Sequence, residues 1–275
     1  MAPALTEDVS LVATASSAAH DAKASASLGA VTGPAQSPAM DKLVGDIRAA
    51  FEAEKALGHT IDNSQDPESF QRLNAKIQGL LKEYAQHNPH DWRRYAFFND
   101  VHYVRNLVEG NSDFELIVLC WKTGQVSRVH NHANSHCWLA VLEGDMREVQ
   151  YQRVQEHGGP HQPPFVDELA AQAAARRSDG GGLHLEGRAL VDETKTTDMR
   201  VGDVGYINDH IALHTVGCHM APGALPADGC GGGWVAQGGV TLHLYAPPIR
   251  RVRIYENDGI TERTPGYYSR AGVRV

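Results

Sequence analysis

The sequence predicts a mainly β protein, a barrel of short strands with α-helices packed on its outside. From Tyr95 onward, short apolar runs alternate with turns that contain Gly and Asp, a pattern typical of strands. No long helical pattern alternates with these runs, which disfavours a parallel α/β sheet. The helical patterns come earlier in the chain. We therefore expect a single domain at residues 39–275 with its helices at residues 39–90, and strands near 114–121, 138–142, 146–151 and 240–245.

Two amphipathic helices are expected in the N-terminal part. Between Asp41 and Leu57, apolar residues recur at four-residue steps, as on a helix with one buried face. A second helix follows Asp66, where a capping side chain, a first-turn proline and an early acid come in succession. This helix should end near Asn88-Pro89.

Three segments are expected to lie outside the barrel. Residues 1–38 are rich in Ala and Ser and carry a single Lys or Arg, Lys23, which suits neither a signal peptide nor a transit peptide and indicates a disordered tail. Residues 155–188 contain Pro-Pro and Gly-Gly-Gly and indicate a surface insertion. Residues 217–239 form a Gly-rich loop that either connects strands or lines a site.

Composition limits the partners of this chain. Its 275 residues are 42% hydrophobic, enough for a buried core, and its formal net charge of -8 disfavours nucleic acid and anionic membranes. No apolar run is long enough to span a bilayer, and the four cysteines form no CxxC pair, which favours the reducing cytoplasm. We expect a cytoplasmic monomer that acts on a small molecule.

A histidine pair in the first long strand region indicates a metal site. Successive strand side chains point to opposite faces, so His130 and His132 share one face and can hold a single ion. A chain with fifteen histidines should contain one such pair by chance, roughly, so the context matters. Spacing alone allows either His210 or His214 as a third ligand. Imidazole binds Zn, Cu, Ni or Fe, so these ligands do not identify the ion.

The spacing G-x5-H-x-H-x4-C-x6-G, from Gly124 to Gly144, resembles the first signature of the cupin superfamily, with Cys137 at the position that glutamate usually occupies. Within that superfamily, the segments HNHANSHC, YVRNL, IVLCW, YINDHIALH and TLHLYAPP together resemble the eukaryotic-type cysteine dioxygenases, over about Trp92 to Pro248. The resemblance implies a cupin double-stranded β-barrel, or jelly roll, with the N-terminal helices packed outside.

The resemblance also implies the metal and its ligands. It favours His214 over His210 as the third ligand beside His130 and His132, and it implies Fe(II). Three neutral imidazoles leave the charge of a divalent ion uncompensated, so an anionic ligand such as a substrate thiolate is favoured.

One strand next to the site carries polar side chains on a single face. Thr241, His243 and Tyr245 alternate with apolar residues, and periodicity alone would equally allow the solvated side of a half-buried strand. The resemblance implies that Tyr245 presents its phenol at the iron, that His243 hydrogen-bonds this phenol, and that Thr241 orients the His243 ring. It further implies a thioether crosslink between Cys137 and Tyr245.

The resemblance places the substrate on two residues of YVRNL. Arg105 would bind a carboxylate in two parallel hydrogen bonds, a geometry that lysine cannot reproduce. Tyr103 would contact the substrate beside it. The remaining cysteines are expected to be small buried apolar residues, namely Cys120, Cys218 and Cys230.

These expectations predict a cysteine dioxygenase, which adds both atoms of O2 to the thiol of L-cysteine and forms cysteine sulfinic acid. Two other thiols are alternatives: 3-mercaptopropionate lacks the amine, and cysteamine lacks the carboxylate and would leave Arg105 unpaired. A non-catalytic cupin that uses its metal for folding or ligand sensing is a third alternative. Structural metal sites, however, are normally closed by a fourth protein ligand, and this sequence offers three.

Overall fold

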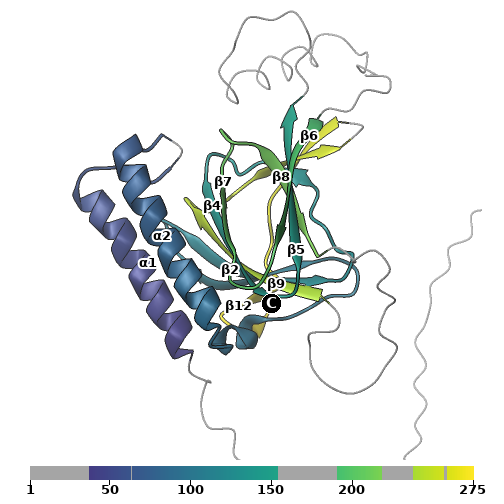
Figure 1. Cartoon of the computed structure of the whole chain (residues 1–275), viewed down its shortest axis with the longest axis horizontal. Helices are drawn as coiled ribbons and strands as arrows, with labels where there is room; N and C mark the ends of the chain where they lie inside the picture. Colours follow the sequence, from purple (N-terminus) through teal and green to yellow (C-terminus); the bar gives the residue numbers. More distant parts are fainter. Residues whose placement is uncertain (1–36, 63, 154–190, 219–237, 257–258) are drawn as a thin grey trace, which may run out of the picture. The chain divides into compact units, whose positions relative to one another are not determined.

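The computed structural model describes residues 37–62, 64–153, 191–218, 238–256 and 259–275 (Figure 1). These residues belong to one compact unit, residues 36–275. The expected N-terminal tail, the insertion at 155–188 and nearly all of the Gly-rich loop at 217–239, with Cys230, lie outside the described residues.

The described strands form two sheets that enclose a common interior. The seven-stranded sheet has the spatial order β13 (Val273–Arg274), β12 (Ser269–Arg270), β1 (Val104–Gly110), β2 (Glu115–Lys122), β9 (Gly238–Ala246), β4 (His136–Glu143) and β7 (Val204–Ile207). The six-stranded sheet has the order β11 (Gly259–Arg263), β10 (Val252–Glu256), β3 (Val129–His130), β8 (Leu213–Gly217), β5 (Met146–Arg153) and β6 (Val191–Met199). The named strands pair antiparallel, except β1 with β12. The predicted mainly β barrel is confirmed.

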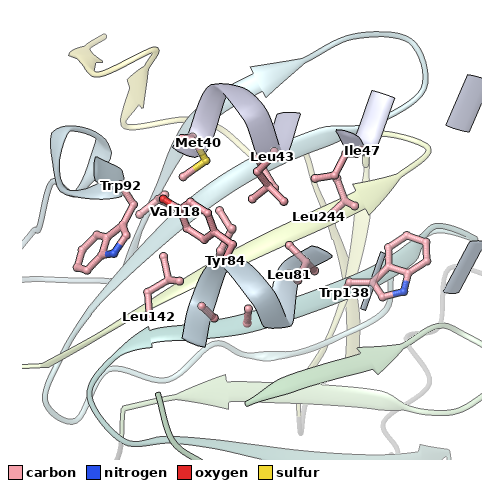
Figure 2. Packing of buried hydrophobic residues seen from close by; sticks show 14 of the residues in the cluster. Met40, Leu43, Ile47, Leu81, Tyr84, Trp92, Val118, Trp138, Leu142 and Leu244 are labelled. Carbon is pink, nitrogen blue, oxygen red and sulfur yellow. The ribbon is translucent and has the colours of Figure 1, made fainter. Parts of the chain in front are cut away.

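Two helices pack against the outer face of the seven-stranded sheet (Figures 1 and 2). They are α1 (Pro38–Ala56) and α2 (Pro67–His87), and a short 3-10 helix, η1 (Asp91–Tyr95), follows them. The Asp66 side chain accepts hydrogen bonds from the first backbone N–H groups of α2, as predicted. The α1 helix begins earlier than expected because proline is tolerated in a first helical turn. Among the described helices, none has the length and apolarity that a membrane crossing requires.

Strand β9 is buried on both faces, and each face has a different role. Leu242 and Leu244 belong to the apolar cluster that the helices cover. Thr241, His243 and Tyr245 point into the barrel and are 0%, 2% and 3% exposed. The polar face of β9 is therefore an interior surface and not the solvated side of the sheet.

Candidate metal centre and its pocket

Three histidines converge inside the barrel. His130 of β3 lies opposite His214 of β8 in the strand register, and His132 follows two residues later. One donor nitrogen from each ring lies within 4.8 Å of the other two, and the Nε2 atoms of His132 and His214 are 3.1 Å apart. His210 lies exposed in the turn before β8 and is not a member of this group.

Hydrogen bonds on the far side of two rings set which nitrogen faces the centre. His214 Nδ1 lies 2.8 Å from a carboxylate oxygen of Glu148, and His130 Nδ1 lies 2.8 Å from the Arg128 carbonyl oxygen. A backbone carbonyl oxygen can only accept a hydrogen bond, and the same holds for an ionised carboxylate. With Glu148 ionised, each Nδ1 therefore carries the proton and each Nε2 keeps its lone pair.

Asp209 positions the loop that carries His132. Its carboxylate accepts hydrogen bonds from the backbone N–H groups of His132, at 2.5 Å, and Asn134, at 2.9 Å. The His132 Nδ1 atom lies 3.7 Å from the same carboxylate. The carboxylate thus fixes the backbone on both sides of Ala133, which has a left-handed conformation with φ 51°.

The three rings fit a divalent cation. Burial, followed by repulsion from His132, lowers the pKa of His130 to about 4 and the pKa of His214 well below its ordinary value. Both rings are therefore neutral near pH 7 and can bind metal. Two nitrogens that share one ion at about 2.1 Å lie roughly 3 Å apart, which agrees with the observed separation of the His132 and His214 nitrogens.

A chain of hydrogen bonds runs along the interior face of β9. The Tyr245 hydroxyl lies 3.1 Å from His243 Nδ1, and His243 Nε2 lies 3.0 Å from the Thr241 hydroxyl. The indole N–H of Trp121 donates to this hydroxyl at 2.9 Å. Burial, followed by repulsion from Arg105, lowers the pKa of His243, so its ring is neutral and can both donate and accept in this chain.

Cys137 and Tyr245 are direct neighbours across two strands. The register of β4 and β9 places them opposite each other, and both are buried. Side chains in such a pair have Cβ atoms about 5 Å apart, so the thiol can reach the phenol ring. Burial raises the pKa of both groups, so the thiol and the phenol are protonated at neutral pH.

Arg105 and Tyr103 lie beside Tyr245. The Arg105 guanidinium is 5.5 Å from the Tyr245 ring centre, and its Nη2 is 3.2 Å from Glu115. Tyr103 immediately precedes β1 and stacks on Trp121 with ring centres 4.3 Å apart. One cavity of about 770 Å³ is lined by Tyr103, Arg105, Trp121 and Tyr245, together with His130, His214 and His243.

The sequence reasoning missed three residues of this site. Glu148 orients His214, Glu115 contacts Arg105, and Trp121 ends the β9 hydrogen-bond chain. Glu115 carried a signal, because it begins a strand that is otherwise apolar up to its last residue. Glu148 carried none, because its strand, MREVQYQR, alternates apolar with other polar residues. Trp121 carried none, since its N–H partner is 120 positions away in the sequence.

Three converging imidazoles beside a deep cavity, inside a double-stranded β-barrel, define a metal-binding protein of the cupin class. The family model described as "Cysteine dioxygenase type I" matches residues 69–222, more than half of the chain. The chain belongs to the cysteine dioxygenase type I family. This family is metal-dependent, in agreement with the three-histidine centre.

Two curated relatives extend this match. The chain is 30% identical over 184 residues to cysteine dioxygenase type 1 of Danio rerio, covering 66% of this chain and 69% of that one. It is 28% identical over 205 residues to the protein of the same name from Rattus norvegicus, covering 73% and 79%. A solved Klebsiella pneumoniae protein with a double-stranded β-helix domain aligns at a TM-score of only 0.33 and 13% identity, over 60% of this chain and 93% of that one. The fold assignment rests on the strand order itself.

Proposed function

We propose that this protein is a cysteine dioxygenase that uses Fe(II) and O2 to convert L-cysteine to cysteine sulfinic acid. One observation carries the proposal: the imidazoles of His130 and His214, whose Nδ1 atoms are hydrogen-bonded elsewhere, line the same cavity as the buried guanidinium of Arg105. His130, His132 and His214 would hold the iron. The product is at an oxidation level that is not readily reversed, so the reaction would commit cysteine to breakdown.

The substrate would contact the site at both of its ends. Its thiolate would supply the negative charge that three neutral imidazoles do not provide. Its carboxylate would bind Arg105, whose Nε–H is buried and has no hydrogen-bond partner among the described residues. Tyr103 would contact the substrate beside Arg105. Bound Fe(II) would supply the redox chemistry that transfers both oxygen atoms to sulfur.

Tyr245 would act beside the reacting sulfur. His243 and Thr241 hold its hydroxyl at one place in the cavity, where it could donate a hydrogen bond during oxygen transfer. A thioether between Cys137 and a Tyr245 ring carbon would fix the phenol further. Its formation removes one hydrogen from sulfur and one from the ring, and the two electrons pass to dioxygen. Peptide mass mapping would show the joined peptides lighter by two hydrogens.

Oxygen uptake with three thiols tests the proposal. We expect iron-loaded protein to consume O2 with L-cysteine, to form the sulfinate, and to lose this activity when a chelator removes the metal. A higher kcat/KM for 3-mercaptopropionate or cysteamine would overturn the substrate assignment. Uptake with none of the three thiols would favour the non-catalytic cupin.

The proposed setting is a cytoplasmic monomer without nucleic-acid or membrane partners. Support comes from the net charge of -8 and from three free, buried cysteines, Cys120, Cys137 and Cys218, which suit a reducing compartment. We also propose that residues 39–275 form a single domain. Light scattering of the purified protein would reveal any stable oligomer.

A further inference from the structure

Glu115 is a buried acid that neither the proposed chemistry nor the metal requires. It begins β2 and is 1% exposed. The strand register places it opposite Tyr245, on the side of β9 away from Cys137. Burying a carboxylate costs considerable free energy unless charges and hydrogen bonds compensate it, so its partners indicate what it does.

Three donors from separate parts of the chain converge on this carboxylate. Arg105 Nη2 of β1 lies 3.2 Å from Oε1, and the Ile249 backbone N–H donates to the same oxygen at 3.3 Å. The Tyr267 hydroxyl, from the segment before β12, donates to Oε2. Glu115 is therefore fixed from three directions and is a rigid anchor for the arginine.

The anchor leaves the arginine available to a ligand. The Arg105 guanidinium lies 5.5 Å from the Tyr245 ring centre and 5.7 Å from the Tyr267 ring centre. Its Nε–H has no hydrogen-bond partner within the described chain, and Arg105 lines the cavity. A long arginine side chain would otherwise lose much rotamer freedom on binding a carboxylate, and prior fixation removes that entropic cost.

We propose that Glu115 is a positioning residue that selects thiols bearing a carboxylate, because it holds Arg105 ready for that group. This inference rests on the proposed function, since it takes Arg105 as the carboxylate-binding residue. A thiol without a carboxylate gains nothing from a prepositioned guanidinium, so Glu115 strengthens the binding of one substrate class only.

Anaerobic titration of iron-loaded protein tests this role without turnover. Calorimetry would give the Kd of L-cysteine and of cysteamine for the wild type, Glu115→Gln and Glu115→Met. Gln keeps a neutral acceptor oxygen, and Met keeps the length but removes the acceptor. We expect Glu115→Met to weaken L-cysteine binding about tenfold, Glu115→Gln to weaken it less, and both to leave the Kd of cysteamine unchanged.

A double variant provides the matched control. Once Arg105→Met has removed the guanidinium, adding Glu115→Met should cause no further loss of L-cysteine affinity. The double variant replaces both partners by apolar groups and so leaves no unpaired charge buried. If Glu115→Met alone fails to fold, the double variant and Glu115→Gln still test the inference. Equal losses for L-cysteine and cysteamine, or additive effects in the double variant, would overturn the inference.

The same titration separates this inference from the proposed function. A wild type that binds L-cysteine without forming sulfinate in air would contradict the proposed function, while the Glu115 comparison would still be decided by binding. A wild type that binds neither thiol would contradict both.

Discussion

At the residue scale, hydrogen bonds on the far side of two of the three imidazoles set which nitrogen is available to a metal. A carboxylate and a backbone carbonyl hold the Nδ1 protons of His214 and His130, so both Nε2 lone pairs face the centre. Spacing predicted that His130 and His132 share one face, but it left His210 and His214 open as the third member, and the resemblance favoured His214, which does join the group. Glu148 escaped prediction because its contact with His214 joins two strands 66 positions apart in the sequence.

Removing Glu148 should weaken metal binding without removing a ligand. In Glu148→Ala, His214 loses the acceptor for its Nδ1–H, and its ring is free to rotate or change tautomer. We expect the Kd for iron to rise by about 10- to 100-fold, measured by competition with a chelator. Glu52→Ala, on the exposed side of α1, is the control and should bind iron like the wild type. An unchanged Kd in Glu148→Ala would show that His214 does not depend on this acceptor.

Removing His243 should affect turnover and not metal content. In His243→Ala, the Tyr245 hydroxyl loses its partner at 3.1 Å, while the hydrogen bonds that orient His130 and His214 stay in place. We expect kcat to fall by about tenfold or more, with an unchanged ratio of iron to protein. A parallel loss of iron and activity would instead make His243 part of the metal site.

At the scale of elements, the two faces of β9 have different roles: one contributes to stability and the other lines the candidate site. Its even-numbered residues pack under the helices, and its odd-numbered residues line the barrel. The period-two pattern predicted the two faces. It could not show that both are buried, because that depends on the helices on one side and the second sheet on the other.

A substitution on the helix-facing side of β9 should therefore change stability alone. Leu242→Ala removes a fully buried side chain from the cluster beneath α1 and α2. We expect the free energy of unfolding to fall by 2–5 kcal/mol, roughly, in denaturant titrations. The kcat of the folded protein should stay at the wild-type value, in contrast to substitutions at His243. A comparable loss of kcat would mean that the two faces are coupled.

His136 links the loop between the helices to the barrel and should make stability depend on pH. Its Nδ1 lies 2.7 Å from the Tyr206 hydroxyl and its Nε2 lies 3.0 Å from the Asp62 carbonyl oxygen. Burial lowers the pKa of His136 to about 4, below the value of about 6.5 in an unfolded chain. Between these values the unfolded state binds more protons, so stability is full above pH 6.5 and falls as the pH drops toward 4.

The matched variant is His136→Gln, which cannot titrate. Between pH 7 and pH 5, the wild type should lose about 2 kcal/mol more unfolding free energy than the variant. Titration of the other histidines is common to both proteins and cancels. Parallel stability curves in denaturant titrations would contradict the assigned role of His136.

The strands that the sequence did not predict, β6 and β3, both lack a recognisable apolar pattern. The helices carry local signals, such as the Asp66 cap, and could be placed from the sequence. Strand β6 reads VDETKTTDM and lies at the edge of its sheet with most residues exposed, so it lacks the apolar alternation of a buried strand. Strand β3 has only two residues and is too short to show any pattern.

At the scale of the whole molecule, the site exists only where the two sheets meet. The six-stranded sheet and its adjoining loop supply the three histidines, and the seven-stranded sheet supplies Tyr245, His243, Arg105 and Glu115. No spacing within one segment could predict this meeting of strands. The resemblance to known sequences predicted that most of these residues lie in one site, because a family resemblance carries information about the complete fold.

The central claim is that this interior cavity directs both atoms of dioxygen to the sulfur of L-cysteine. Turnover of L-cysteine by the iron-loaded protein under ¹⁸O2 in ordinary water, followed by mass spectrometry of the product, tests it most directly. The account predicts cysteine sulfinate with ¹⁸O at both sulfinate oxygens. Cystine as the main product, or a sulfinate that takes one oxygen from water, would contradict it.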